Sequence, residues 1–209
     1  MIYIVTKENR HLFYHALMEM HLQRKRVFMD EMGWPLQEIA GVETDAYDAR
    51  DVVYLIEAET PRGPVTGSVR LLPTNRPHLL KDHFSHLCDG PAPAGDTIWE
   101  ATRFCPAPET PKGPARHALI GRMIGAIMET GLLFGVKHVT FVTTTGVAPL
   151  AMEAGWTVVP LGPARRKGRE SLRAFVAEID AAGAERVRAR IGATAPLTHC
   201  EPGRIAAAA

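Results

Sequence analysis

Three arginines in the first half of the chain are well suited to binding an anion. Arg24 falls on the apolar stripe of a predicted helix, seven residues after Leu17 and four before Phe28. A guanidinium on an apolar face is costly unless an anion pairs with it, either a core acid or the carboxylate of a ligand. Arg70 and Arg103 are further guanidinium groups that can bind a carboxylate through two hydrogen bonds.

Acids accompany these arginines. Residues 35–50 have no periodicity and contain Asp45 and Asp48, so a solvated acidic loop is the default interpretation. The two acids, three positions apart, can bind a cation or brace the arginines. Glu100 lies on a half-apolar predicted strand, where desolvation raises a carboxyl pKa toward the value that a general base needs. A purely structural pair with Arg103 is the alternative for Glu100.

Read together, these residues form an ordered series. It runs Arg24, Phe28, Trp34, Asp45, Asp48, Arg70, Glu100, Thr102 and Arg103. This series resembles the LuxI-type acyl-homoserine lactone synthases. The resemblance implies an acyltransferase that makes a quorum-sensing autoinducer from S-adenosylmethionine and an acyl thioester, carried by acyl carrier protein or CoA, with no further cofactor. It implies amide formation followed by lactonisation, which releases methylthioadenosine.

The resemblance also implies roles for single residues. The catalytic set is Glu100, Thr102 and Arg103. The expected S-adenosylmethionine site consists of Arg24, Phe28, Trp34, Asp45, Asp48, Arg70, Phe84 and Arg103. Glu100 is then the base that takes a proton from the attacking amine. Backbone N–H groups near residues 101–104 would stabilise the tetrahedral oxyanion.

An acyl group needs an apolar slot, and a carrier protein, being acidic, needs a basic docking surface. The candidates for the slot are Trp99, Phe104, Met123, Ile127, Phe141, Thr143, Met152 and Trp156, most of which are equally suited to an ordinary core. The candidates for docking are Arg165, Arg166, Lys167 and Arg169, for which a solvated hairpin loop is the alternative. Members of the family often carry a basic residue after the strand around 137–144, where this chain has Gly146-Val147-Ala148-Pro149.

Composition limits the possible functions. The chain has 209 residues, 46% hydrophobic and 22% charged, which is typical of one soluble globular domain. A net charge of +1 argues against nucleic acid as the main partner. The apolar run 119–134 is interrupted by Arg122 and Glu129, so we expect no membrane span. Three cysteines without CxxC spacing suggest reduced thiols in a cytoplasm, and the pair His83 and His86 does not predict a metal site.

The pattern of the chain predicts one α/β domain, a mixed twisted sheet flanked by helices, with a C-terminal helix and tail over about 180–209. The resemblance implies a fold like that of the GNAT acetyltransferases. Expected helices are 7–32, 115–134, 147–154 and 184–191, and expected strands are 51–59, 65–72, 97–105, 137–144, 156–161 and 170–179. Strand alternation puts Glu100 and Arg103 on opposite faces, so a shared site requires a bulge between them.

Two other functions fit some of these features. One is a GNAT-type N-acyltransferase that uses acyl-CoA on another amine. Its pyrophosphate-binding turn would fall at Pro111-Lys112-Gly113-Pro114, where two prolines lack N–H donors. The other is a catalytically silent ligand-binding domain, which would be expected to have lost Glu100 or one of the arginines.

Overall fold

A computed structural model describes residues 1–48, 51–168 and 170–201. The strands are β1 (Ile2–Val5), β2 (Glu38–Ile39), β3 (Val42–Glu43), β4 (Val53–Ala58), β5 (Val65–Pro73), β6 (Ile98–Pro106), β7 (His138–Thr144), β8 (Val158–Pro160), β9 (Arg165–Lys167), β10 (Glu170–Glu178) and β11 (Thr198–His199). The α-helices are α1 (Tyr14–Arg24), α2 (Leu79–His83), α3 (Pro114–Leu133), α4 (Ala148–Met152) and α5 (Ala181–Arg190). Short 3-10 turns span Arg10–Phe13 and Ser85–Leu87, and a π-helical segment spans Lys25–Glu31.

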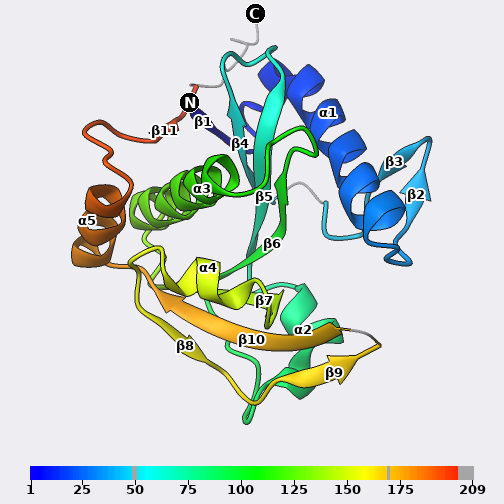
Figure 1. Cartoon of the computed structure of the whole chain (residues 1–209), viewed down its shortest axis with the longest axis vertical. Helices are drawn as coiled ribbons and strands as arrows, with labels where there is room; N and C mark the ends of the chain where they lie inside the picture. The colour runs from blue at the N-terminus through cyan, green and yellow to red at the C-terminus, as the bar shows by residue number, and fades with distance from the viewer. Residues whose placement is uncertain (49–50, 169, 202–209) are drawn as a thin grey trace, which may run out of the picture.

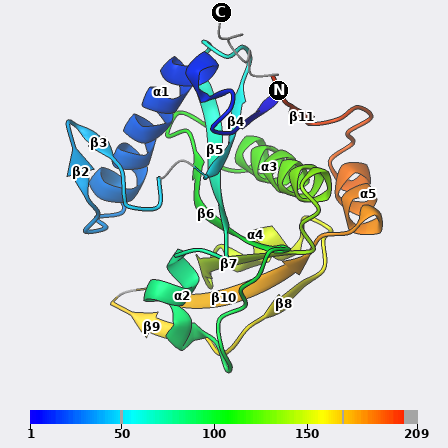
Figure 2. The same cartoon turned by 180° about the vertical axis from the view of Figure 1, so that it is seen from behind.

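One large twisted sheet carries the fold, with helices on both of its faces (Figures 1 and 2). Its strand order is β11-β1-β4-β5-β6-β7-β10-β8, β9 pairs with β10, and β2 and β3 form a separate small hairpin. β6 pairs antiparallel with β5 and parallel with β7. The sheet is therefore mixed, as the sequence predicts.

Each face of the sheet has its own core. Apolar side chains of α3, among them Met123 and Ile127, pack against Leu55 and Val69 of the sheet. The opposite face is covered by α1 over β4 and β5, and by α2 over β7 and β10. Since alternate residues of a strand point to opposite faces, β5 buries Val69 under α3 and directs Arg70 toward the α1 side.

Several expected elements differ in detail. The predicted helix 7–32 is divided into a 3-10 turn, α1 and the π-helical segment. The expected loop 35–50 contains the β2–β3 hairpin, which turns through positive φ at Ala40 and Gly41. The expected hairpin loop around 165–167 is strand β9, and residues 198–199 add a parallel strand beside β1. These strands are short and lack alternation, so only their pairing reveals them.

β6 and β7 separate toward their C-terminal ends. The parallel register runs from Ile98 opposite His138 to Ala101 opposite Phe141. Beyond that point β6 continues to Pro106 and β7 to Thr144. The two strands thus part next to the segment that contains Thr102 and Arg103.

Candidate active site

Arg24 is the centre of a buried ion-pair cluster. Its side chain is 1% exposed and makes three hydrogen bonds: Nε to Glu43 Oε2 at 2.5 Å, and Nη1 and Nη2 to the two oxygens of Asp48 at 2.8 and 2.9 Å. Burial acts to lower the pKa of Arg24, but hydrogen bonds and charge from Asp48 and Glu43 outweigh it and raise that pKa. Burial likewise acts to raise the pKa of Asp48, yet Arg24 and Arg70 hold it well below its usual range. Arg24 and Asp48 therefore form a charged pair inside the protein.

Arg70 binds both Asp45 and Asp48. Its Nη1 donates to Asp45 Oδ1 at 2.6 Å and to Asp48 Oδ1 at 2.7 Å, and its Nη2 donates to Asp45 Oδ2 at 3.0 Å. Its Nε donates to Thr102 Oγ1 on the neighbouring strand at 3.0 Å. Asp48 also accepts from the Tyr54 hydroxyl at 2.7 Å. Arg70 thereby fixes residues 44–48, the acidic segment, against β5 and β6.

The bulge predicted in β6 is present. Ser68 pairs with Cys105 and Arg70 with Thr102, so one residue of β5 stands opposite two residues of β6, and Arg103 has φ +51°. A non-glycine residue rarely adopts positive φ, and the conformation turns the Arg103 side chain toward the cluster. Its Nη2 donates to Glu43 Oε1 and to Asp45 Oδ2, both at 3.0 Å.

The aromatic pair of the expected site is assembled by a glycine turn. Gly33 has φ +68° after the π-helical segment, and the Trp34 N–H donates to the Phe28 carbonyl at 2.8 Å. Left-handed glycine at this position is a common way to end a helix. The turn stacks the Trp34 ring on Phe28, with centroids 5.2 Å apart and planes 17° apart, and Arg103 Cζ lies 5.7 Å from the Phe28 centroid.

Glu100 is buried on the same face of β6 as Thr102. It is 1% exposed, and its Oε1 accepts from the Leu80 N–H at the start of α2 at 2.9 Å. Among the described residues, Oε2 has no hydrogen-bond partner. Burial raises the pKa of Glu100 to about 7, against the lowering effect of the Leu80 and Leu79 N–H groups and of Arg70. A carboxyl group with this pKa and one free oxygen is equipped to accept a proton near neutral pH.

The structure thus brings most of the predicted site together. The ion-pair cluster (Arg24, Arg70, Arg103, Glu43, Asp45 and Asp48) joins three guanidinium groups to three carboxylates, with Phe28 and Trp34 at one side and Thr102 and Glu100 at the other. Phe84 lies apart in a second group of side chains, packed with Leu80 and Leu87 of α2 and its following turn. Its ring centroid is 5.1 Å from Lys167 Nζ.

The remaining predicted residues occupy two regions. Trp99, Met123, Ile127 and Trp156 are buried in the core under α3, with Phe104 and Phe141 at its margin. Thr143 is half-buried on β7, whereas Met152 is 49% exposed. Arg165, Arg166 and Lys167 are exposed on β9, and Arg169 lies outside the described residues. Their roles in acyl binding and carrier docking stay predictions.

Sequence reasoning missed three side chains that organise this site. Glu43 is fully buried and binds both Arg24 and Arg103, although it lies in the segment 35–50 that the sequence predicts to be a solvated loop. Tyr54 holds Asp48 from β4. Tyr47 lies with its ring 5.8 Å from Arg70 Cζ. The one available signal was the position of Glu43 two residues before Asp45.

The family of the chain follows from comparison with known proteins. The model of the autoinducer synthase family matches residues 9–187. The chain belongs to the autoinducer synthase family. Among curated relatives, the acyl-homoserine-lactone synthase of Rhizobium etli is 33% identical over 167 residues, covering 79% of this chain and 78% of the relative. The isovaleryl-homoserine lactone synthase of Bradyrhizobium diazoefficiens is 34% identical over 165 residues, covering 78% and 72%.

Solved structures of other autoinducer synthases superimpose on almost the whole chain. BjaI, a CoA-dependent acyl-homoserine lactone synthase bound to S-adenosylmethionine and isopentyl-CoA, has a TM-score of 0.88 at 29% identity and covers 98% of this chain and 95% of its own. LasI has a TM-score of 0.75 at 28% identity, covering 91% and 93%. An acyl-CoA N-acyltransferase from Pseudomonas aeruginosa, at 15% identity and a TM-score of 0.55, shares the fold alone.

These comparisons confirm the predicted family, the GNAT-like fold and the activity of an acyltransferase that makes acyl-homoserine lactones. In the described part of the chain, no helix is long and apolar enough to cross a membrane. The same residues contain no group of three His, Cys, Asp or Glu side chains able to hold a metal ion.

Proposed function

We propose that this autoinducer synthase uses the ion-pair cluster to bind S-adenosylmethionine and Glu100 to activate its amine toward an acyl-CoA. The single observation that carries the proposal is the convergence of the ion-pair cluster and Glu100 at the point where β6 and β7 part. The similarity to BjaI, whose structures contain S-adenosylmethionine with isopentyl-CoA and, separately, MTA, supports the same pair of substrates here.

The geometry suits a zwitterion that also carries a sulfonium. Arg103 can offer N–H groups to the substrate carboxylate, and it is held rigid by Glu43 and Asp45. The Arg70 side chain is 0% exposed and bound by Asp45, Asp48 and Thr102, so it supports the site from behind. The stacked Phe28 and Trp34 rings offer aromatic faces to the cationic sulfonium. Arg24 is enclosed by protein carboxylates, so its main contribution is to orient Glu43 and Asp48.

Glu100 then serves the first step. It takes a proton from the ammonium group, either directly or through one water, and the neutral amine attacks the thioester carbonyl. The new N–C bond forms and the C–S bond breaks; the nitrogen loses a second proton as the amide forms, and the leaving sulfur takes up one proton, so CoA leaves as the thiol. The second step closes the lactone. The carboxylate of the methionine moiety attacks the carbon next to the sulfonium. The O–C bond closes the lactone, the C–S bond breaks, and methylthioadenosine leaves as a neutral thioether.

Acyl-CoA is favoured as donor because BjaI and MesI, which match this chain with TM-scores of 0.88 and 0.84, are both described as CoA-dependent. Carrier-bound acyl groups are the alternative, supported by the basic strand β9. The test is to incubate the purified chain with S-adenosylmethionine and matched acyl-CoA and acyl-carrier donors, and to identify products by mass spectrometry. We expect acyl-homoserine lactone and methylthioadenosine with acyl-CoA at the higher kcat/KM. A higher kcat/KM with the carrier donor would overturn the CoA assignment.

A further inference from the structure

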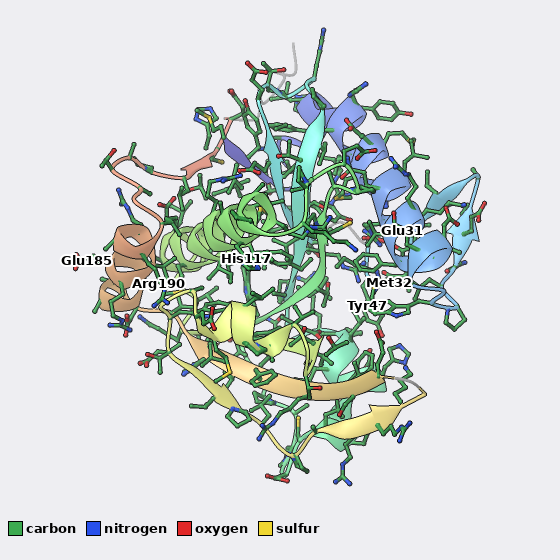
Figure 3. All side chains as sticks on the ribbon, in the orientation of Figure 1. Glu31, Met32, Tyr47, His117, Glu185 and Arg190 are labelled. Atoms are coloured by element: carbon green, nitrogen blue, oxygen red, sulfur yellow. The ribbon has the colours of Figure 1, made fainter. Side chains whose placement is uncertain are left out.

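Tyr47 connects the acidic segment to helix α2, and each of these two elements contacts a different part of the proposed site. Its hydroxyl donates to Asp82 Oδ2 at 2.9 Å and lies 3.0 Å from His83 Nε2. Tyr47 belongs to the acidic segment between β3 and β4, whereas Asp82 and His83 belong to α2, so the contact joins residues 35 and 36 positions apart. Figure 3 labels Tyr47 where the acidic segment faces α2.

The phenol acts in this contact as a fixed donor. Burial, followed by the hydrogen bond and charge of Asp82, raises the pKa of Tyr47 to about 12. The phenol therefore keeps its proton at neutral pH, which excludes Tyr47 as the general base. The hydroxyl proton is donated to Asp82, which leaves the phenol oxygen as the acceptor in its contact with His83 Nε2.

On one side of this contact the acidic segment holds Arg70, and on the other side α2 holds Glu100. On the acidic segment, the Tyr47 N–H donates to Asp45 Oδ1 at 2.9 Å, and Asp45 in turn binds Arg70. The Tyr47 ring also lies 5.8 Å from Arg70 Cζ. On α2, the Leu80 N–H holds Glu100 Oε1 at 2.9 Å. The spacing of Glu100, Arg70 and Arg103 is set by the pairing of β5 and β6, but a shift of α2 relative to the acidic segment would move the Leu80 N–H away from Glu100 Oε1.

We propose that Tyr47 is a positioning residue that locks the acidic segment to α2, and so holds the Leu80 N–H on Glu100 Oε1, which orients the free Oε2 for the attacking amine. This inference rests on the proposed role of Glu100. A small loss of positioning matters at such a site because the reacting groups must lie within hydrogen-bond reach of each other. The alternative is an exposed surface hydrogen bond with no effect on catalysis.

Three variants separate these possibilities. Tyr47→Phe keeps the ring beside Arg70 and removes only the hydroxyl, and Asp82→Asn weakens the acceptor. Tyr14→Phe makes the same chemical change at a tyrosine on α1 that is 72% exposed. We expect Tyr47→Phe to lower kcat/KM for S-adenosylmethionine about fivefold to tenfold, the effect of one typical net hydrogen bond, with a thermal midpoint close to that of the wild type because the contact is exposed. Tyr14→Phe should match the wild type.

Asp82→Asn tests the acceptor of this contact and, through the Asp82 charge, the Glu100 carboxyl itself. Glu100 is faced by Arg70, by Asp82 and by the N–H groups of α2, and the Asp82 charge raises its pKa. Removing that charge should lower the pH at which kcat/KM reaches half its maximum, besides reproducing the loss seen for Tyr47→Phe. A Tyr47→Phe enzyme identical to Tyr14→Phe in kcat and KM, while Glu100→Gln is impaired, would overturn the lock and leave the proposed function standing. Full turnover of Glu100→Gln would overturn both.

Discussion

Arg24 and Asp48 face each other through two parallel hydrogen bonds of 2.8 and 2.9 Å, in a place where the arginine side chain is 1% exposed. The pair is formed by two side chains of the protein itself. The arginine on the apolar helix stripe is therefore satisfied by core acids, and its effect on the substrate passes through Glu43 and Asp48. Arg24 therefore belongs to the residues that support the site, and not to those that contact the substrate.

Arg24→Ala should therefore be mainly a stability variant. Removing one partner leaves Glu43 and Asp48 buried without their cation, which costs about 3–5 kcal/mol in the free energy of unfolding. Arg26→Ala, two residues later, is the matched control, because Arg26 is 52% exposed and pairs with exposed Glu109. That change should cost about 0–1 kcal/mol. The free energies of unfolding of both variants are measured by urea denaturation. Equal losses in the two variants would show that the cluster does not stabilise the fold.

Glu100→Gln should keep the fold and lose the base. Turnover is expected to fall by roughly 10²-fold or more, measured as methylthioadenosine release under saturating substrates. Glu109→Gln removes an exposed carboxylate that pairs with Arg26 and serves as the control. Wild-type turnover in Glu100→Gln would reduce Glu100 to a structural residue.

The raised pKa of Glu100 also fixes the direction of the pH dependence. The base works ionised, so kcat/KM should rise with pH through a midpoint near the pKa of about 7 and fall on the acid side. Stability should change in the opposite sense. The folded state binds this proton more tightly than the unfolded state, whose pKa is near 4.5, so the contribution present below 4.5 is lost as pH rises through about 7.

Glu100→Gln lacks this titration. Its free energy of unfolding should be less dependent on pH between about 4.5 and about 7, the range set by the two pKa values, than that of the wild type. If the free energies of unfolding of the two proteins depend on pH in the same way, the pKa of Glu100 is not raised in the folded protein.

The basic strand β9 tests the choice of donor. Arg165→Glu with Arg166→Glu should raise KM for an acyl-carrier donor much more than KM for acyl-CoA, because docking of an acidic protein depends on complementary charge. Arg62→Glu with Arg190→Glu makes the same change in net charge at exposed positions on other surfaces. If both double variants change the two KM values alike, β9 is not a docking surface.

The sequence predicted best what depends on local pattern. Helix α3 was expected at 115–134 and spans Pro114–Leu133, because its apolar residues repeat with helical spacing over five turns and Gly135 ends it with φ +71°. The bulge in β6 was predicted because Glu100 and Arg103 have opposite parity on a strand and both were expected at one site. Its φ at Arg103 confirms that expectation.

What the sequence did not predict depends on partners far along the chain. Glu43 looks like any acid of a loop until the fold places it beside Arg24 and Arg103, 19 and 60 residues away. Tyr47 and Asp82 are 35 residues apart, and no periodicity connects them. Short strands such as β9 and β11 exist only through pairing with β10 and β1.

The most direct test of the account follows both products of one reaction. The purified chain is supplied with S-adenosylmethionine labelled in its methionine carbons and with an acyl-CoA, and the lactone and methylthioadenosine are quantified together. We expect labelled acyl-homoserine lactone and methylthioadenosine in a one-to-one ratio. Acyl transfer to another amine, or no release of methylthioadenosine with any acyl thioester, would contradict a site built from the ion-pair cluster and Glu100 to join these two substrates.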